Sequence, residues 1–122
     1  MRLGTDIIEI DRIKKAIDRS DRFRQRVYTE HEIAYCESKR TGSYQSYAGI
    51  YAAKEAFLKA LRTGLRYGSW QDIEVCHDEF GAPFLSITGA FKTIIQERMY
   101  TECIVSISHC RSYAMSTVII KG

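Results

Sequence analysis

The clearest pattern of apolar and polar positions lies between Ser43 and Arg62, where it repeats with the period of an α-helix. From Tyr51 to Leu61 the chain consists mostly of strong helix formers and contains neither glycine nor proline. Ser43 is expected to cap the start of this helix, and Gly64 to stop its end. The pattern therefore predicts a helix of about five and a half turns.

One side of this helix carries polar side chains that are candidates for a functional site. Tyr51, Glu55 and Lys59 follow one another at i, i+4 and i+8, so they share a face. Alanines at positions 48, 52 and 56 flank them, and such small residues leave room for another group to approach the helix. A solvated Glu–Lys pair explains the same spacing without any ligand.

The N-terminal segment predicts a strand over residues 2–10 with an acid, Asp6, in its middle. Aspartate is depleted in strands, so the position of Asp6 in the middle of one needs an explanation. A solvated edge position and a ligand role both remain open. A helix is expected over residues 11–27, capped by Asp11 and with a possible restart at Ser20.

The rest of the chain alternates between short helices and hairpins. Thr29 and Glu32 form a capping-box signature for a helix that ends near Ser38. Together the elements predict an α+β domain in which a small, mostly antiparallel sheet packs on the long central helix. The remaining predicted elements are strands at 70–77 and 83–87 around a turn, a helix from 89 to about 100, and strands at 103–109 and 113–120.

Length and composition are consistent with one domain spanning residues 1–122. The chain is 45% hydrophobic, which is sufficient for a core, and it contains no apolar run long enough for a transmembrane helix. Acids near the start, such as Asp6, argue against a signal peptide. The four cysteines show no metal-ligand spacing, so free thiols in a reducing cytoplasm are expected.

The charge is concentrated locally. Residues 11–26 hold seven basic and three acidic side chains, a net charge of +4, whereas the whole chain carries only +3. Arg12, Arg19 and Arg22 belong to a basic stripe at helical spacing, and Phe23 lies next to it. Local basicity suggests an acidic partner surface, although a solvated helix face explains it equally well.

Asp6 and Glu55 are the best candidates for a site that binds a hard cation. Mg²⁺ is typically held by one or two carboxylates, while waters and substrate phosphates complete its coordination. Lys59, one turn beyond Glu55, could then neutralise charge on a phosphate oxygen. Two acids far apart in sequence only make such a site possible.

Four motifs occur in order that together resemble a known family. They are GTDIIEI at residues 4–10, YAAKEAFLKA at 51–60, DIEV at 72–75 and VSISH at 105–109. They are similar to the motifs of the bacterial holo-acyl-carrier-protein synthases, the small 4′-phosphopantetheinyl transferases, over nearly the whole chain. The resemblance implies transfer of 4′-phosphopantetheine from coenzyme A to a serine of apo-acyl carrier protein, a step of fatty acid biosynthesis that also gives adenosine 3′,5′-bisphosphate.

The resemblance also implies roles for individual residues. Asp6 and Glu55 match the magnesium ligands, and together with Lys59 they match the catalytic residues near the diphosphate. The acidic carrier protein would dock on Arg12, Arg19, Arg22 and Phe23. The implied contacts to coenzyme A are Lys39, Arg40, Lys54, Lys59, Gly64, Pro83, Ser108 and His109, of which Lys39, Arg40 and His109 lie near its 3′-phosphate.

Three positions depart from the family pattern. Ile50 replaces a common basic residue, Arg62 replaces a frequent glycine, and Ala82 replaces a frequent lysine. These departures concern nucleotide binding and leave the implied metal ligands intact. Because each motif occurs once, whereas the large transferases resemble two fused halves, the resemblance implies a homotrimer with active sites between protomers.

Two rival classes use the same features. A small nucleic-acid-binding module could use the basic stripe, but the net charge of only +3 and the scattered tyrosines argue against it. A non-catalytic trimeric adaptor would keep only the surface for the carrier protein. The presence of both Asp6 and Glu55 argues against an adaptor. No membrane or nucleic-acid partner is therefore expected.

Overall fold

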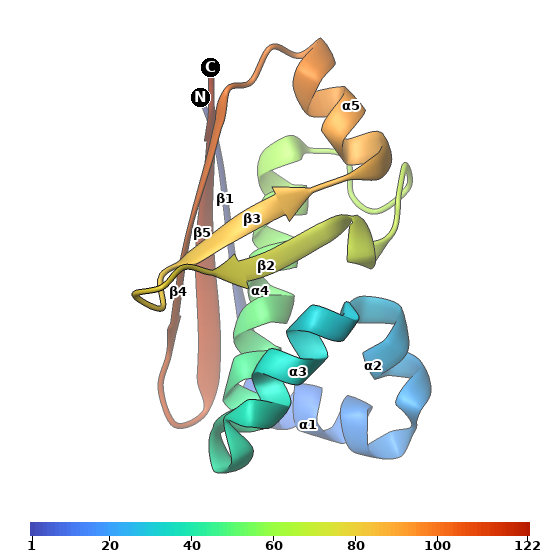
Figure 1. Ribbon diagram of the computed structural model, residues 1–122, viewed down its shortest axis with the longest axis vertical. Helices are drawn as coiled ribbons and strands as arrows, with labels where there is room; N and C mark the ends of the chain where they lie inside the picture. Colours follow the sequence, from blue (N-terminus) through green and yellow to red (C-terminus); the bar gives the residue numbers. More distant parts are fainter.

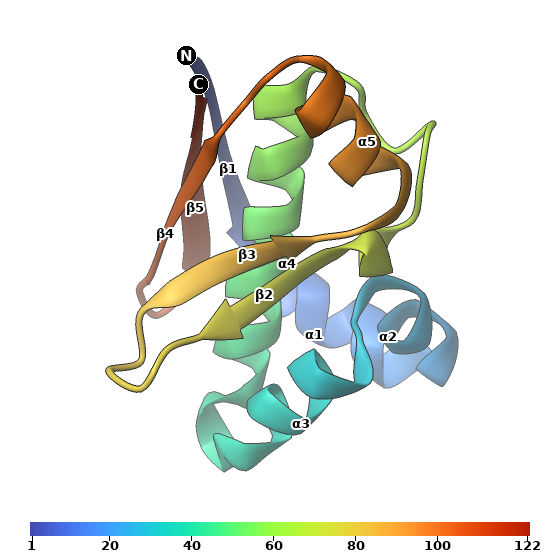
Figure 2. The ribbon, with the colours of Figure 1, turned by 45° about the horizontal axis from the view of Figure 1, so that its top comes forward.

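Helix α4 (Ser43–Leu61) forms the axis of the molecule, and the computed structural model, which describes residues 1–122, arranges every other element around it (Figure 1). Helices α1 to α3 gather at the end where α4 begins, and the two termini lie side by side at the other end (Figures 1 and 2). The other elements are β1 (Arg2–Glu9), α1 (Ile10–Arg19), α2 (Asp21–Val27), α3 (Glu30–Ser38), β2 (Ile73–His77), β3 (Pro83–Ile87), α5 (Gly89–Glu97), β4 (Glu102–His109) and β5 (Tyr113–Lys121), with short 3₁₀ turns at Arg40–Gly42 and Trp70–Asp72.

The strands form two antiparallel sheets, where the sequence predicted one. A three-stranded sheet has the order β1-β5-β4, and β2 and β3 pair separately as a hairpin. Asp6 lies opposite Ser116 in the first sheet. The α+β class and the packing of an antiparallel sheet on the central helix are confirmed. The separate hairpin crosses α4 on another side (Figure 2).

Strand β1 lies directly against α4 because one residue of the strand has no side chain. A Cβ atom at Gly4 would stand 2.0 Å from the carbonyl oxygen of Ala56 and 2.6 Å from the nitrogen of Ala60. Ala52, Ala56 and Ala60 are fully buried. The room beside the alanines is therefore filled by β1 and not by a ligand, which corrects the interpretation from sequence. The close contact brings Asp6 to the face of α4 that carries Glu55.

Two predicted helix caps are wrong. Ser43 is the first residue of α4 and follows Gly42 at the cap position, where no side chain caps the helix. Asp11 lies inside the first turn of α1, and the cap position belongs to Glu9, whose side chain makes no capping bond. At Gly42 the chain enters α4 from a 3₁₀ turn, so the backbone continues an existing helical turn.

Helix α3 is tied to α4 by a buried ion pair. The predicted capping box of Thr29 and Glu32 is present. The Glu32 carboxylate also accepts hydrogen bonds from the Lys54 ammonium, at 2.7 Å, and from the backbone N–H of Val75, at 2.7 Å. Both charged side chains are fully buried. Removing one partner of such a pair costs roughly 3–5 kcal/mol, so this contact fixes how α3 and β2 are held on α4.

The remaining element boundaries differ little from the prediction. The strand expected from Trp70 begins at Ile73, because residues 70–72 form a 3₁₀ turn, and α5 ends at Glu97. The helix expected over 11–27 is broken by the extended residue Ser20 into α1 and α2, at the predicted restart. None of the helices combines the length and the hydropathy that a membrane crossing requires.

Candidate active site

The first half of the candidate site, called here the carboxylate cleft, lies beside the C-terminal half of α4. Glu55 and Lys59 line it, and Asp6 of β1 contacts Lys59 next to it. The Lys59 ammonium lies 2.9 Å from the Asp6 carboxylate and 3.0 Å from the carbonyl oxygen of Thr5. The Asp6 side chain is only 13% exposed, whereas that of Lys59 is 52% exposed. Lys59 therefore pairs with Asp6 on the strand, and the alternative interpretation of a Glu55–Lys59 pair within α4 is not supported.

Glu55 lies on the same face of α4 as Lys59, close enough for the negative charge of Asp6 to affect its ionisation. Burial and the negative charge of Asp6 raise the pKa of Glu55, and Lys59 and the Tyr51 side chain oppose the rise. Lys59 alone therefore does not balance the two carboxylates. A divalent cation would relieve this repulsion.

This donor set fits Mg²⁺ better than a softer metal. No group of three or more histidine, cysteine, aspartate or glutamate side chains occurs in the structure. Mg²⁺ keeps several waters and needs only one or two carboxylates when a substrate supplies phosphate oxygens. Asp6 and Glu55 are the residues that would hold it, and their oxygen atoms are the ligands that a hard cation prefers.

The cleft itself has a volume of about 260 Å³ and continues past the end of α4. Gly64, which was predicted to bind coenzyme A, lines it and adopts a φ of 61°, a value that favours glycine. Helix α4 stops two residues before Gly64, at Arg62, which takes the left-handed cap position. Trp70 lines the cleft too and stacks on Tyr51 with ring centroids 5.4 Å apart.

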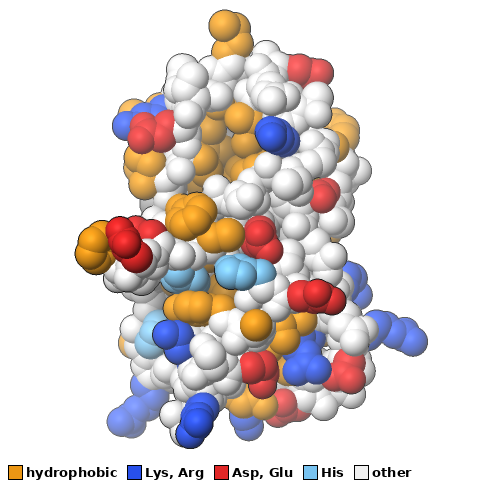
Figure 3. All heavy atoms as spheres, viewed as in Figure 1, with side chains coloured by type: hydrophobic (Ala, Val, Ile, Leu, Met, Phe, Trp, Pro, Cys, Tyr) orange, Lys and Arg blue, Asp and Glu red, His pale blue; other side chains and the backbone are white.

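The second half of the candidate site, called here the histidine cleft, has a volume of about 180 Å³ and lies beside the N-terminal half of α4. His109 from β4 and Pro83 from β3 line it, as two of the predicted coenzyme A contacts. Histidine side chains gather at mid-height of the face shown in Figure 3, next to exposed hydrophobic ones.

Sequence reasoning missed His77, which also lines the histidine cleft. Its ring stacks on that of Tyr35, with centroids 3.8 Å apart and planes within 8°. The Nδ1 atom of His77 is buried and makes no hydrogen bond, and burial, Lys39 and His31 together lower the pKa of His77. The only signal in the sequence was its place at the end of a predicted strand, just before a turn.

The basic residues near the histidine cleft are exposed. The Lys39 ammonium lies 4.8 Å from the centre of the Tyr35 ring, which links it to the wall that Tyr35 and His77 form. Arg40 is exposed in the following 3₁₀ turn with a φ of 55°. Ser108 faces the opposite side of β4 from its neighbour Ile107 and lines a separate shallow cleft.

The two clefts lie on opposite sides of α4. Ser46 lines the histidine cleft and Glu55 the carboxylate cleft. They are nine residues apart, which is about two and a half turns, so their side chains leave the helix in opposite directions. The structure therefore does not bring His109 to Asp6 and Glu55 within one chain.

The structure contradicts the assignment of Lys54 to coenzyme A. This side chain is fully buried, and its ammonium donates to Glu32, to the carbonyl of Val27 at 2.6 Å and to the carbonyl of Trp70 at 3.1 Å. All three donors of the ammonium are used, so Lys54 has none left for a phosphate. It is a core residue, one position from Glu55.

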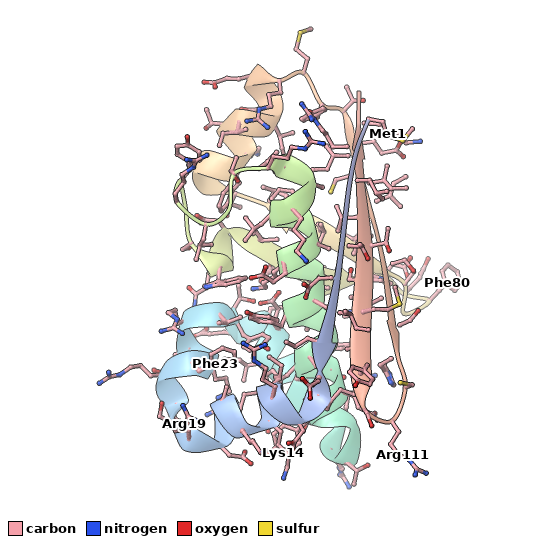
Figure 4. All side chains as sticks on the ribbon, turned by 180° about the vertical axis from the view of Figure 1, so that it is seen from behind. Met1, Lys14, Arg19, Phe23, Phe80 and Arg111 are labelled. Atoms are coloured by element: carbon pink, nitrogen blue, oxygen red, sulfur yellow. The ribbon has the colours of Figure 1, made fainter.

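The predicted surface for the carrier protein lies on α1 and α2. Arg12, Arg19 and Arg22 are exposed, and Lys and Arg side chains gather toward this end of the molecule (Figure 3). The break at Ser20 means that they do not form one continuous helical stripe. Phe23 instead packs inward, 6.1 Å from the Tyr51 ring, on the side of α2 that faces α4 (Figure 4).

The chain belongs to the 4′-phosphopantetheinyl transferase superfamily. The family model matches residues 2–118. A holo-[acyl-carrier-protein] synthase of Ruminiclostridium cellulolyticum is 45% identical over 123 residues, covering 99% of this chain and 92% of the relative. The recognition of this family from four motifs is thereby confirmed.

Solved structures agree with this assignment. The fold matches the Helicobacter pylori holo-[acyl-carrier-protein] synthase in complex with coenzyme A, with a TM-score of 0.86 and 30% identity over 98% of this chain and 99% of that one. It also matches the Bacillus anthracis holo-(acyl-carrier-protein) synthase in complex with coenzyme A (3′,5′-ADP). That match has a TM-score of 0.80 and 34% identity over 98% of this chain and 94% of that one.

Proposed function

We propose that this chain transfers the 4′-phosphopantetheine group of coenzyme A to a serine of apo-acyl carrier protein. The products are holo-acyl carrier protein and adenosine 3′,5′-bisphosphate. The observation that carries the proposal is the pairing of Asp6 on β1 with Glu55 and Lys59 on α4, in a chain of this family. It is the arrangement expected of a site that stabilises a diphosphate.

Asp6 and Glu55 hold Mg²⁺ in this proposal. When bound, the ion supplies positive charge that stabilises the transferring phosphoryl group. Lys59 adds an ammonium on the exposed side of the cleft, where a diphosphate oxygen can exchange with its contact to Asp6. Catalysis of this type depends mainly on positioning and electrostatic stabilisation.

The covalent change is an in-line displacement. The serine oxygen of the carrier protein attacks the β-phosphorus, and the bond from that phosphorus to the bridging oxygen breaks. Adenosine 3′,5′-bisphosphate leaves with the bonding electron pair. The serine proton passes to Glu55, either directly or through a water molecule in the cleft.

The histidine cleft binds the nucleotide end of coenzyme A. His109 and Pro83 line this cleft, and Lys39 and Arg40 supply exposed positive charge near it for the 3′-phosphate. Because the two clefts of one chain face opposite directions, a single coenzyme A must bridge two chains. We therefore propose a cyclic homotrimer whose active sites lie between protomers.

The outer face of the three-stranded sheet supports self-association. Leu3 and Ile7 on β1 are each 65% exposed, and Ile104 and Met115 on the neighbouring strands are 42% and 41% exposed. Exposed apolar patches of this kind mark contact surfaces. Ser108 borders the same face, so a coenzyme A contact from Ser108 would require the assembled trimer.

The acidic carrier protein docks on Arg12, Arg19 and Arg22, beside Phe23. Phe23 contacts Tyr51, which precedes Glu55 by one turn of α4, so this surface adjoins the carboxylate cleft. The four cysteines are free thiols, and we propose the cytoplasm as the compartment in which this enzyme acts.

The test is an incubation of the protein with coenzyme A, Mg²⁺ and an apo-acyl carrier protein, followed by intact mass measurement. The carrier protein should gain one 4′-phosphopantetheine group, and the gain should stop when Mg²⁺ is chelated. An unchanged mass with a folded enzyme and a competent carrier protein would refute the proposal. Light scattering at micromolar concentration should give the mass of a trimer.

A further inference from the structure

Arg62 stands at the mouth of the carboxylate cleft in a backbone conformation that favours glycine. Its φ and ψ are 64° and 31°, and it is the residue that ends α4. A residue with a Cβ atom is strained in this region, so glycine is the usual choice at such a helix end. The chain keeps an arginine there, and that needs an explanation.

The fold itself gives no reason for the arginine. Arg62 is exposed, and none of the seven salt bridges includes it. The last carbonyl of the helix, that of Leu61, accepts a hydrogen bond from the Arg98 guanidinium at 2.7 Å. Capping of α4 by a basic side chain is thus done by Arg98.

The charges of the cleft point to a ligand. Glu55, Lys59 and Arg62 all line the cleft. Lys59 already donates hydrogen bonds to the Asp6 carboxylate and to the carbonyl of Thr5. Arg62 is therefore the cation of this cleft that has no partner in the chain. A guanidinium can bind two phosphate oxygens at once, which a lysine ammonium does not do in the same geometry.

We propose that Arg62 is a positioning residue that binds the diphosphate of coenzyme A, one helical turn beyond Lys59 in the same cleft. This proposal rests on the function proposed above and adds a residue to its site. The guanidinium holds non-bridging oxygens of the diphosphate, so that the β-phosphorus faces Glu55 and the incoming serine. The backbone strain at Arg62 is retained because glycine would lose this contact.

In the Arg62→Gly variant we expect the protein to become more stable and to bind coenzyme A more weakly. Arg62→Gly relieves the left-handed backbone, so Tm should rise by about 2–5 °C. The same change removes the guanidinium, so KM for coenzyme A should rise at least about tenfold, whereas KM for the carrier protein should stay within about twofold. A role for Arg62 in the fold predicts a lower Tm instead.

Two further variants separate charge from strain. Arg62→Gln keeps the strained backbone and removes the charge, so it should raise KM for coenzyme A as Arg62→Gly does, without the gain in Tm. Arg62→Lys keeps a positive charge but cannot bind two phosphate oxygens at once. Its KM for coenzyme A should therefore lie between those of the Gly and Gln variants and that of the unmodified protein. Arg66→Gln is the matched control, since Arg66 lies 5.1 Å from the Tyr67 ring and does not line the cleft.

The decisive measurement is the KM for coenzyme A and the Kd for coenzyme A by calorimetry, for all four variants. Tenfold weaker binding in Arg62→Gly and Arg62→Gln, with Arg66→Gln unchanged, supports the proposal. Coenzyme A affinity within twofold of the unmodified protein in both, or a rise in KM confined to the carrier protein, would overturn it. If the unmodified protein binds coenzyme A but transfers nothing, the proposed function fails, and the Kd values still decide the role of Arg62.

Discussion

The carboxylate cleft and the histidine cleft border the same helix, yet they differ in nearly every chemical respect. The carboxylate cleft is lined by Glu55, whose pKa is raised, and by Lys59, which contacts the Asp6 carboxylate beside the cleft. The histidine cleft contains no carboxylate and is lined by His77, His109 and the Tyr35 ring. In the function proposed above, the carboxylate cleft binds the metal and the diphosphate, and the histidine cleft binds the nucleotide end of coenzyme A.

The difference between the clefts lies in how completely the charges around α4 are compensated. The two clefts face opposite sides of α4. The core between them is held by satisfied charges, such as the buried Lys54–Glu32 pair, whereas the charges in the carboxylate cleft are left unbalanced. Buried charges whose hydrogen bonds and ion pairs are all satisfied hold the fold together. Charges that lack a full set of partners favour the binding of a ligand that supplies them.

The largest expected effect is on turnover. Glu55→Gln or Asp6→Asn should lower kcat by at least about a thousandfold, because a carboxamide is a poor ligand for a hard cation. Affinity for adenosine 3′,5′-bisphosphate should change little if the histidine cleft binds it. Kinetics together with calorimetry of the folded variants would check both. Glu97→Gln, an exposed carboxylate on α5, is the control, and near-normal turnover by Glu55→Gln would remove Glu55 from the site.

A change in the histidine cleft should have the opposite kinetic signature. His109→Ala should raise KM for coenzyme A by about 10–100-fold, as expected for a lost hydrogen bond to a charged group, and kcat at saturation should fall far less. Steady-state kinetics over a range of coenzyme A concentrations would show this. A fall in kcat equal to that of Glu55→Gln would mean that His109 takes part in the chemical step and does not only bind the nucleotide.

The docking surface should respond to only one substrate. Arg22→Glu should raise KM for the carrier protein about tenfold, because charge reversal opposes an acidic partner, and KM for coenzyme A should hardly move. Added salt should weaken the unmodified enzyme more than the variant, since exposed charges are screened. Equal effects on both substrates would place Arg22 in the nucleotide site instead. Lys92→Glu on α5, also exposed, is the control.

The smallest expected effect is on stability without metal. Because burial and Asp6 raise the folded-state pKa of Glu55, its ionised form destabilises the metal-free fold at pH 8. Glu55→Gln should therefore raise Tm by about 1–3 °C at pH 8 in the presence of a chelator. The gain should shrink as pH falls through the raised pKa and vanish below the ordinary value of 4.5. A gain that is the same at every pH would exclude this origin.

Local patterns in the sequence predicted the elements well, and contacts between distant segments explain what they missed. The helical period located α4, and the capping box at Thr29 was correct. The period could not tell that Lys54 meets a buried acid while Lys59 faces solvent, because both lie on one apolar-rich helix and their partners are more than 20 positions away. His77 was missed for the same reason, since its importance comes from its contact with Tyr35.

The central claim is that a working site takes its carboxylate cleft from one protomer and its histidine cleft from another. It is tested most directly by co-expressing Glu55→Gln and His109→Ala chains with different tags and purifying assemblies that carry both. In a mixed trimer about one interface in three joins an intact Glu55 to an intact His109. The account predicts about a third of the unmodified activity at low coenzyme A concentration. Activity no greater than the average of the two single variants would contradict it.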